Sequence, residues 1–324
     1  MKMLLKSINI GKLKTGNLFL APMAEITNYP FRKILLENGC DFIISEMVSA
    51  KALSHRNKKS LQAIKIRDDK PIAIQLFGSD EITMLEAANL CVENDADMIE
   101  INAGCPVKKV IKTGAGVSLM KNPHILCKIT ETLASKLQIP VSVKIRIGLD
   151  EKHKTAITLS KDLENAGAGV IHIHLRTANQ YHSGSIDFET AAKIKSIIKI
   201  PLIANGGINS VEKAIEMFEK TGCDAISIAR AAISNPFIFS DIKEFLLKKE
   251  KTQVSLSKKI STFIRYLEIS EQIFGERDAL IKSRRLAGLW LSGFPNAAMT
   301  RAKFMKAKSI TEAKKIISEI NYEN

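Results

Sequence analysis

Eight short runs of apolar and β-branched residues recur over the first 230 residues, and this recurrence constrains the fold more than any other feature. Amphipathic stretches with helical spacing separate them, for example at 82–94, 124–137 and 211–221. A strand followed by a helix, repeated eight times, is typical of a (β/α)8 TIM barrel. A doubly wound sheet is the alternative, weakened because no G-x-G-x-x-G follows the first run. The runs lie at 17–23, 41–48, 72–78, 98–104, 141–146, 170–176, 201–207 and 225–230.

The pattern changes after Phe239, beyond which no strand-like run remains. Ser309 and Glu312 have the spacing of a capping box that would open the last helix. We therefore expect a boundary near residue 245, with a barrel domain over 1–245 and a small C-terminal helical-bundle domain over 246–324. The helices are predicted at 255–274, 277–291, 296–307 and 311–321.

The composition fits a folded, water-soluble protein, since 25% of the 324 residues are charged and 45% are hydrophobic. No apolar stretch is long enough to span a bilayer, and residues 1–16 lack the apolar core of a signal peptide. The five cysteines show no C-x-x-C spacing, which argues against a disulfide framework and a zinc site. We therefore expect a cytoplasmic protein with no membrane contact.

The net charge of +14 indicates a polyanionic partner. Half of the excess lies in the last 84 residues, which hold 17 basic and 10 acidic side chains. The alternative is a lysine-rich surface that only solvates the protein, and the uneven distribution disfavours it.

Polar residues collect at the predicted strand ends, where TIM barrels carry their active sites. Gly206-Gly207 and Ala229-Arg230 follow the seventh and eighth strands, where barrels often hold a phosphate, although a tight turn would also explain the glycines. Lys144 either lies at the rim or faces an anion, such as the N1–C2=O edge of a reduced flavin. We expect the residues at these strand ends to converge at one end of the barrel. They are Pro22, Met23, Glu46, Met47, Gln75, Asn102, Cys105, Lys144, Arg146, His174, Arg176, Asn205, Gly206, Gly207 and Arg230.

Cys105 is the one cysteine in a Gly/Pro-rich loop at a strand end, where a thiol can act as a nucleophile or a general acid. His172 and His174 share one face of the sixth strand. A metal pair is one interpretation, but no acidic residue joins them in a ligand spacing. The alternative is that His172 is a satisfied core histidine.

The motifs at these strand ends resemble the tRNA-dihydrouridine synthase family over the whole barrel, in order and at compatible spacings. The I-N-x-G-C-P segment is the most specific, together with Lys144 and His174. The motifs are L-A-P-M-A at 20–24, Q-L-F-G at 75–78, I-N-x-G-C-P at 101–106, V-K-x-R-x-G at 143–148, H-x-R-T at 174–177, I-A-N-G at 203–206 and R-A-A at 230–232.

The resemblance implies an FMN-dependent enzyme, with NADPH or NADH as reductant, that reduces the C5–C6 bond of D-loop uridines in tRNA. Hydride would reach C6 from reduced FMN, and Cys105 would protonate C5. It implies cofactor contacts at Pro22, Met23, Ala24, Gln75, Lys144, His174, Asn205, Gly206, Gly207, Ala229 and Arg230. Substrate contacts are expected at Asn102, Arg146, Arg176, Arg284 and Arg285, and no obligate protein partner is expected.

The uridine must leave its stack to reach a flavin, so such an enzyme has to bind folded RNA. The resemblance therefore accounts for the basic tail, because RNA affinity comes largely from phosphate contacts. The tail cations that could make them are Arg277, Lys282, Arg284, Arg285, Arg301, Lys303, Lys306 and Lys308.

Three substitutions depart from the family pattern: Leu175 and Ala178 on either side of the strand-six arginine, and Ala229 before the strand-eight arginine. None removes a reactive group. The alternatives are an FMN barrel that reduces a small pyrimidine, a catalytically silent RNA-binding protein, and a metal-dependent hydrolase.

Overall fold

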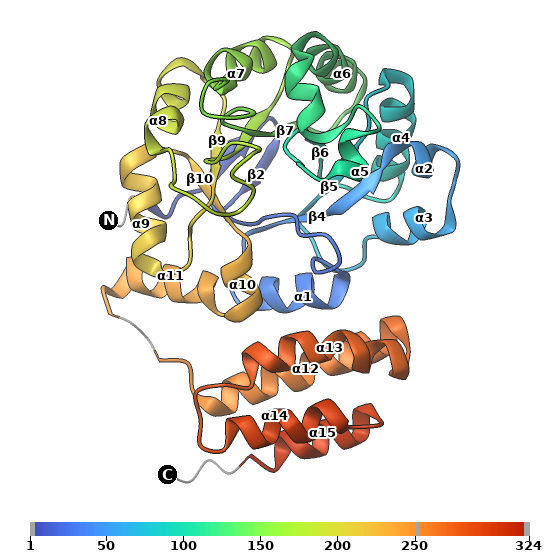
Figure 1. The fold of residues 1–324 in the computed structure, drawn as a ribbon, viewed down its shortest axis with the longest axis vertical. Helices are drawn as coiled ribbons and strands as arrows, with labels where there is room; N and C mark the ends of the chain where they lie inside the picture. Colours follow the sequence, from blue (N-terminus) through green and yellow to red (C-terminus); the bar gives the residue numbers. More distant parts are fainter. Residues whose placement is uncertain (1–3, 251–252, 321–324) are drawn as a thin grey trace. The chain divides into compact units, whose positions relative to one another are not determined.

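The computed structural model describes residues 4–250 and 253–320. Eight parallel strands close into a barrel in the order β10-β3-β4-β5-β6-β7-β8-β9 (Figure 1). They are β3 (Leu18–Leu20), β4 (Phe42–Ser49), β5 (Ile72–Phe77), β6 (Met98–Asn102), β7 (Val141–Arg146), β8 (Val170–His174), β9 (Leu202–Asn205) and β10 (Ala225–Ile228). The TIM barrel predicted from the recurring runs is confirmed, with one strand in each run.

Helices between the strands surround the barrel (Figure 1). Their ends follow ordinary capping chemistry: the Ser210 hydroxyl accepts from the Lys213 N–H where α9 begins, and Gly222 ends that helix with φ +63°. These helices are α2 (Ala50–Ser54), α3 (Lys58–Ile64), α4 (Glu81–Glu93), α5 (Lys108–Ile111), α6 (Pro123–Lys136), α7 (Ala156–Asn165), α8 (Phe188–Ile197) and α9 (Val211–Thr221).

A hairpin that the sequence analysis missed, β1 (Ile8–Ile10) and β2 (Leu13–Thr15), precedes the barrel. Its isoleucines belong to a buried apolar cluster with Phe19, Phe42, Ile44, Ala73, Met98, Val170, Ile203 and Ala225. Most of these residues lie at or near the start of their strands. The hairpin therefore helps to close the N-terminal end of the barrel with a layer of hydrophobic side chains.

The chain folds as two compact units. Of the described residues, the barrel unit contains those up to Asn28 together with Cys40–Ala229, and the helical unit contains Tyr29–Gly39 and those from Arg230 onward. The helix after the first barrel strand, α1 (Tyr29–Glu37), therefore groups with the C-terminal helices. The boundary near residue 245, predicted between the barrel domain and the helical-bundle domain, stays a prediction.

The helical unit is built on an aromatic cluster. The Phe263 ring lies 5.7 Å from Trp290 and 5.4 Å from Phe304, and Trp290 lies 6.4 Å from Phe31 on α1. The Trp290 Nε1–H donates to the Ile233 carbonyl at 2.7 Å. The remaining helices are α10 (Arg230–Ser234), α11 (Ile238–Lys248), α12 (Leu256–Phe274), α13 (Glu276–Trp290), α14 (Ala297–Lys306) and α15 (Ile310–Ser318).

The four helices predicted after residue 250 are confirmed as α12 to α15. The Ser309 hydroxyl accepts from the Glu312 N–H as expected, while the Glu312 carboxylate accepts from the Lys308 N–H. The last helix ends at Ser318, and Asn321, its predicted end, lies outside the described residues. Across the described ranges, no helix has both the length and the apolar character needed to cross a membrane.

Candidate active site

The barrel interior changes from apolar to polar along the strands. Because alternate residues of a strand share a face, the residues two positions beyond the apolar cluster also point inward. The ladder pairs Gln75 with Glu100, Asn102 with Lys144 and Lys144 with His172. One step further it pairs Arg146 with His174, and His174 with Asn205. The residues expected to converge on the C-terminal end of the barrel thus occupy neighbouring strands.

Glu100 lies at the centre of this polar interior with no solvent exposure. Its Oε1 accepts from Gln75 Nε2 at 2.7 Å, and its Oε2 accepts from Ser142 Oγ at 3.0 Å and from His172 Nδ1 at 2.8 Å. Burial alone would raise the pKa of Glu100, but pairing with His172, the Lys144 charge and the Gln75 hydrogen bond lower it below the ordinary value. Glu100 is therefore a buried carboxylate with a full set of donors.

His172 connects Glu100 to Lys144. A carboxylate can only accept, so His172 carries its proton on Nδ1. Its Nε2 then accepts from Ser227 Oγ at 2.6 Å and from Lys144 Nζ at 3.2 Å. Burial, followed by repulsion from Lys144, lowers the pKa of His172 to about 4, so the ring is neutral at pH 7. The interpretation of His172 as a satisfied core histidine is confirmed.

Lys144 is a half-buried cation inside the barrel. Burial lowers its pKa to about 8, which Glu100 opposes and Arg146 reinforces. The ammonium is thus mostly charged at pH 7. Among the ion pairs of the described residues, none engages Lys144 with a carboxylate.

The loop that carries Cys105 is held by strand residues on both sides. Asn102 Oδ1 accepts from the Cys105 N–H at 3.0 Å, and Arg146 Nε donates to the Gly104 carbonyl at 2.8 Å. A Cβ added to Gly116 would lie 2.6 Å from the Cys105 carbonyl oxygen, so only glycine fits against this loop. The position of Cys105 is therefore set by the barrel wall.

The Cys105 thiol is half-buried. Burial raises its pKa above the ordinary value, against the opposing effects of the Val107 N–H and Arg146. The sulfur therefore keeps its proton at neutral pH, which suits a proton donor better than a nucleophile.

Arginines on β7 and just after β8 brace the surrounding loops. Arg146 Nη1 donates to the carbonyls of Thr177 and Tyr181 at 2.8 Å, and Arg176 donates to the Gly184 carbonyl through Nε and Nη2. Burial, then Arg146, Lys144 and Arg176, lower the pKa of His174, so its ring is neutral. These contacts give both arginines a loop-positioning role beside the substrate role expected for them.

The predicted phosphate residues lie after β9 and β10. Gly206 and Gly207 have φ of +124° and +68°, which glycine adopts freely. Asn205 Nδ2 donates to the Ser227 carbonyl at 2.8 Å, which ties the two strand ends together. Ala229 is the last residue of the barrel unit, and Arg230 is the next residue and belongs to the helical unit. The phosphate contacts expected of all these residues stay predictions.

The segment after β3 holds Pro22, Met23 and Ala24. The Ala21 N–H donates to the Ile228 carbonyl at 2.9 Å, which places this segment beside the end of β10. The Met23 carbonyl accepts from the Thr27 N–H and hydroxyl, each at 3.0 Å, and closes a turn. Pro22 and Met23 are half-buried and Ala24 is exposed.

The two arginines predicted to contact RNA on α13 have different environments. Arg285 is exposed. Arg284 is half-buried, its Nη2 donates to the Ala307 carbonyl at 3.4 Å, and its Nε is buried without a hydrogen-bond partner among the described residues. Arg284 therefore has a structural contact within the helical unit that the sequence did not indicate.

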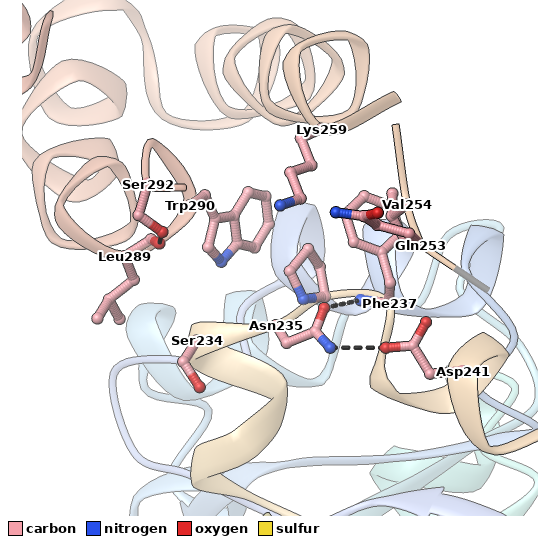
Figure 2. A pocket seen from close by; sticks show the side chains of 11 residues that line it. Ser234, Asn235, Phe237, Asp241, Gln253, Val254, Lys259, Leu289, Trp290 and Ser292 are labelled. Carbon is pink, nitrogen blue, oxygen red and sulfur yellow. Dashed lines mark hydrogen bonds between the residues drawn. The ribbon is translucent and has the colours of Figure 1, made fainter. Parts of the chain in front are cut away.

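The helical unit also contains a cavity of about 310 Å³ (Figure 2). Asn235 Nδ2 donates to Asp241 on its wall at 2.8 Å, and Lys259 and Trp290 lie opposite. None of the site residues expected from the sequence lines this cavity.

Sequence reasoning missed Glu100, Ser142 and Ser227 because it considered only the last residues of each strand. One signal was present: Glu100 is the lone carboxylate in the apolar strand M-I-E-I-N, two residues before Asn102 and on the same face. Among the described residues, no group of three or more His, Cys, Asp and Glu side chains could hold a metal ion. The metal-hydrolase alternative has no ligand set there.

Solved structures with this fold cover most of the chain. Morphinone reductase aligns with a TM-score of 0.57 at 14% identity, over 79% of this chain and 92% of that chain. An old yellow enzyme homologue from Zymomonas mobilis aligns with a TM-score of 0.56 at 13% identity, over 79% and 95%. At these identities the likeness shows the fold alone.

Sequence comparisons identify the family to which this chain belongs. The family described as Dihydrouridine synthase (Dus) matches residues 19–323. A probable tRNA-dihydrouridine synthase of Rickettsia bellii is 33% identical, covering 91% of each chain. A tRNA-dihydrouridine synthase B of Pseudomonas aeruginosa is 35% identical over 92% of this chain and 90% of that protein. The motifs at the strand ends and these matches agree, and the chain belongs to the dihydrouridine synthase family.

Proposed function

We propose that this protein reduces the C5–C6 bond of D-loop uridines in tRNA, using FMN and either NADPH or NADH. The observation that carries the proposal is that Asn102, which holds the loop of the protonated thiol Cys105, pairs in the sheet with the interior cation Lys144. The membership of the family and the names of its relatives support the same reaction. With all five cysteines free, we place the activity in the cytoplasm.

The barrel unit fits a flavin mononucleotide on two counts. Gly206 and Gly207 turn with positive φ, and no hydrogen bond of the described residues engages their N–H groups, which leaves them for a phosphate. Lys144 carries a charge inside the barrel and would hold the N1–C2=O edge of the ring. Gln75, His174 and the Pro22–Ala24 segment would contact the rest of the cofactor.

Reduced FMN, when bound, would supply hydride to C6 of the uracil. The negative charge at C5 and O4 would then need a proton, which Cys105 would donate to C5 from its thiol. Asn102 keeps the Cys105 loop in place and would lie beside the base. Arg146 and Arg176 hold neighbouring loops through their carbonyl contacts and would contact the substrate.

The helical unit would hold the tRNA through phosphate contacts. Its exposed cations, such as Arg285, Lys303 and Lys306, are the candidates for these contacts. Because the uridine has to leave its stack to reach the barrel, binding of folded RNA is part of the reaction.

The test is to map dihydrouridine in tRNA after incubation with the protein, FMN and NADPH. The variant Cys105→Ala, loaded with equal flavin, should form at least about a hundredfold less, because general acid catalysis contributes about 10²–10⁴-fold. Cys127→Ala is the matched control, since Cys127 is also half-buried but lies on α6. It should form dihydrouridine like the unchanged protein.

Other outcomes point to other functions. A yellow protein that oxidises NADPH but leaves every uridine intact would indicate a flavoenzyme acting on a small pyrimidine. A colourless protein that binds tRNA and reduces nothing would indicate a catalytically silent RNA-binding protein.

A further inference from the structure

The hydrogen bonds around Glu100 form two arms that lead to the two reactive groups of the barrel. The first arm runs from Glu100 to Gln75, then to Asn102 and the Cys105 N–H. The second runs from Glu100 to His172 and then to Lys144. No part of the proposed reaction uses the Glu100 carboxylate itself.

The first arm is directional because Glu100 can only accept hydrogen bonds. Gln75 must present its NH2 group to Glu100, so its Oε1 faces Asn102 and accepts from Nδ2 at 2.8 Å. Asn102 must then present its Oδ1 to the loop, where it accepts from the Cys105 N–H at 3.0 Å and the Gly104 N–H at 3.3 Å. The carboxylate thus fixes the orientation of both side-chain amides.

The second arm is directional for the same reason. Glu100 requires the proton of His172 to be on Nδ1, which leaves Nε2 as an acceptor for Lys144 and Ser227. With the proton on Nε2, the ring would point a donor at the Lys144 ammonium, and that contact would become repulsive.

We infer that Glu100 is a positioning residue that orients the Cys105 loop and Lys144 together, through Gln75 with Asn102 on one side and His172 on the other. The roles of Cys105 and Lys144 rest on the proposed function. The orientation of the groups is a property of the folded barrel and can be measured without tRNA.

The variant Glu100→Gln tests the inference, because an amide of the same size must turn its donor half toward one arm. If the donor faces Gln75, both side-chain amides flip and Asn102 opposes the Cys105 N–H. If it faces His172, the ring proton moves to Nε2 and opposes Lys144. One arm must therefore fail in a protein of nearly unchanged shape.

Each arm has its own readout in the FMN-loaded protein. Release of the loop should raise the rate at which iodoacetamide alkylates Cys105 by about tenfold, the effect of losing a hydrogen bond to a buried group. Displacement of Lys144 should lower the midpoint potential of the bound FMN, because the reduced ring loses its cation. A purely structural role for Glu100 predicts neither change in a folded variant.

Ser142→Ala is the matched control. It removes one hydrogen bond to the same carboxylate, at 3.0 Å, but interrupts neither arm. Its Cys105 alkylation rate and FMN midpoint potential should equal those of the unchanged protein. The inference is overturned if folded Glu100→Gln also matches the unchanged protein in both measurements.

The double variant Gln75→Glu with Glu100→Gln covers the case in which the single variant folds poorly. Exchanging the carboxylate and the amide restores a donor opposite every acceptor in both arms, whereas Gln75→Glu alone sets two carboxylates against each other. The double variant should therefore melt at a higher temperature than either single variant, and its Cys105 should be alkylated at the original rate.

A double variant that melts no higher than Glu100→Gln contradicts the inference. Failure to form dihydrouridine would count against the proposed function and leave these results standing.

Discussion

The two units of this chain place their ionisable side chains in opposite ways. The barrel unit buries Glu100, His172 and much of Lys144 inside its strands, and each has a defined set of neighbours. The helical unit buries an aromatic cluster and keeps most of its cations exposed. A buried charge needs partners that fix its geometry, so the barrel can orient reacting groups. Exposed cations keep their freedom and suit attraction of a polyanion.

The largest expected effect concerns the aromatic cluster. Phe304→Ala should lower the free energy of unfolding of the helical unit by about 4 kcal/mol, because Phe304 is fully buried and its removal leaves a cavity. Hydrogen exchange should report the loss in α12 to α15. Comparable loss of protection in β5 to β8 would show that the two units do not differ in this way.

Removal of one cation should have unequal consequences in the two units. Lys144→Met should slow reduction of the bound flavin by NADPH by about a hundredfold, the effect of removing a fixed electrostatic contact to the charge that develops on the ring. Lys306 is an exposed cation of the helical unit. Lys306→Met should leave this rate unchanged and raise only the tRNA concentration needed for half-maximal formation of dihydrouridine. Equal slowing by the two variants, measured by stopped-flow absorbance of the flavin, would contradict this difference between the units.

The buried histidine should make the barrel sensitive to acid. The unfolded chain binds a proton at His172 below about pH 6.5, and the folded chain binds it only below about pH 4. Stability is therefore full above pH 6.5 and is lost as the pH falls toward 4, by about 3 kcal/mol in total. Urea unfolding across this range should show a flatter profile for His172→Asn, and an unchanged slope would exclude His172 as the cause.

The smallest effects separate two neighbouring arginines. Arg285→Ala should leave the melting temperature unchanged and lower the salt dependence of tRNA binding by about one phosphate contact. Arg284→Ala should cost about 1 kcal/mol of stability, because it removes the hydrogen bond to Ala307. A lower melting temperature for Arg285→Ala, together with an unchanged one for Arg284→Ala, would contradict this assignment.

The barrel could be predicted from the sequence because each strand is a local run with its own turn signals. The strand-end residues followed from the fold, since the C-terminal ends of eight parallel strands meet at one place. The hairpin β1–β2 was not predicted because strands of three residues are too short to show a clear alternation of apolar and polar residues. The grouping of α1 with the helical unit depends on contacts such as Phe31 with Trp290, which lie far apart in the sequence.

The Glu100 network shows the limit of reading strand ends alone. Each of its members could be recognised as inward-facing from the two-residue period, but the hydrogen bonds join strands that are not neighbours, such as β6 to β8 and β8 to β10. The tail cations present the opposite difficulty. Arg284 and Arg285 are adjacent in sequence, and only their packing separates a structural contact from an exposed charge.

A single turnover of the pre-reduced, FMN-loaded protein with tRNA tests the central claim most directly, because it removes NADPH from the measurement. We predict that tRNA reoxidises the flavin with formation of dihydrouridine, and that Cys105→Ala does so about a hundredfold more slowly while NADPH reduces both proteins at the same rate. A Cys105→Ala protein that reoxidises at the original rate would contradict the assignment of the proton donor. Reduced flavin that tRNA leaves untouched would contradict the proposed reaction itself.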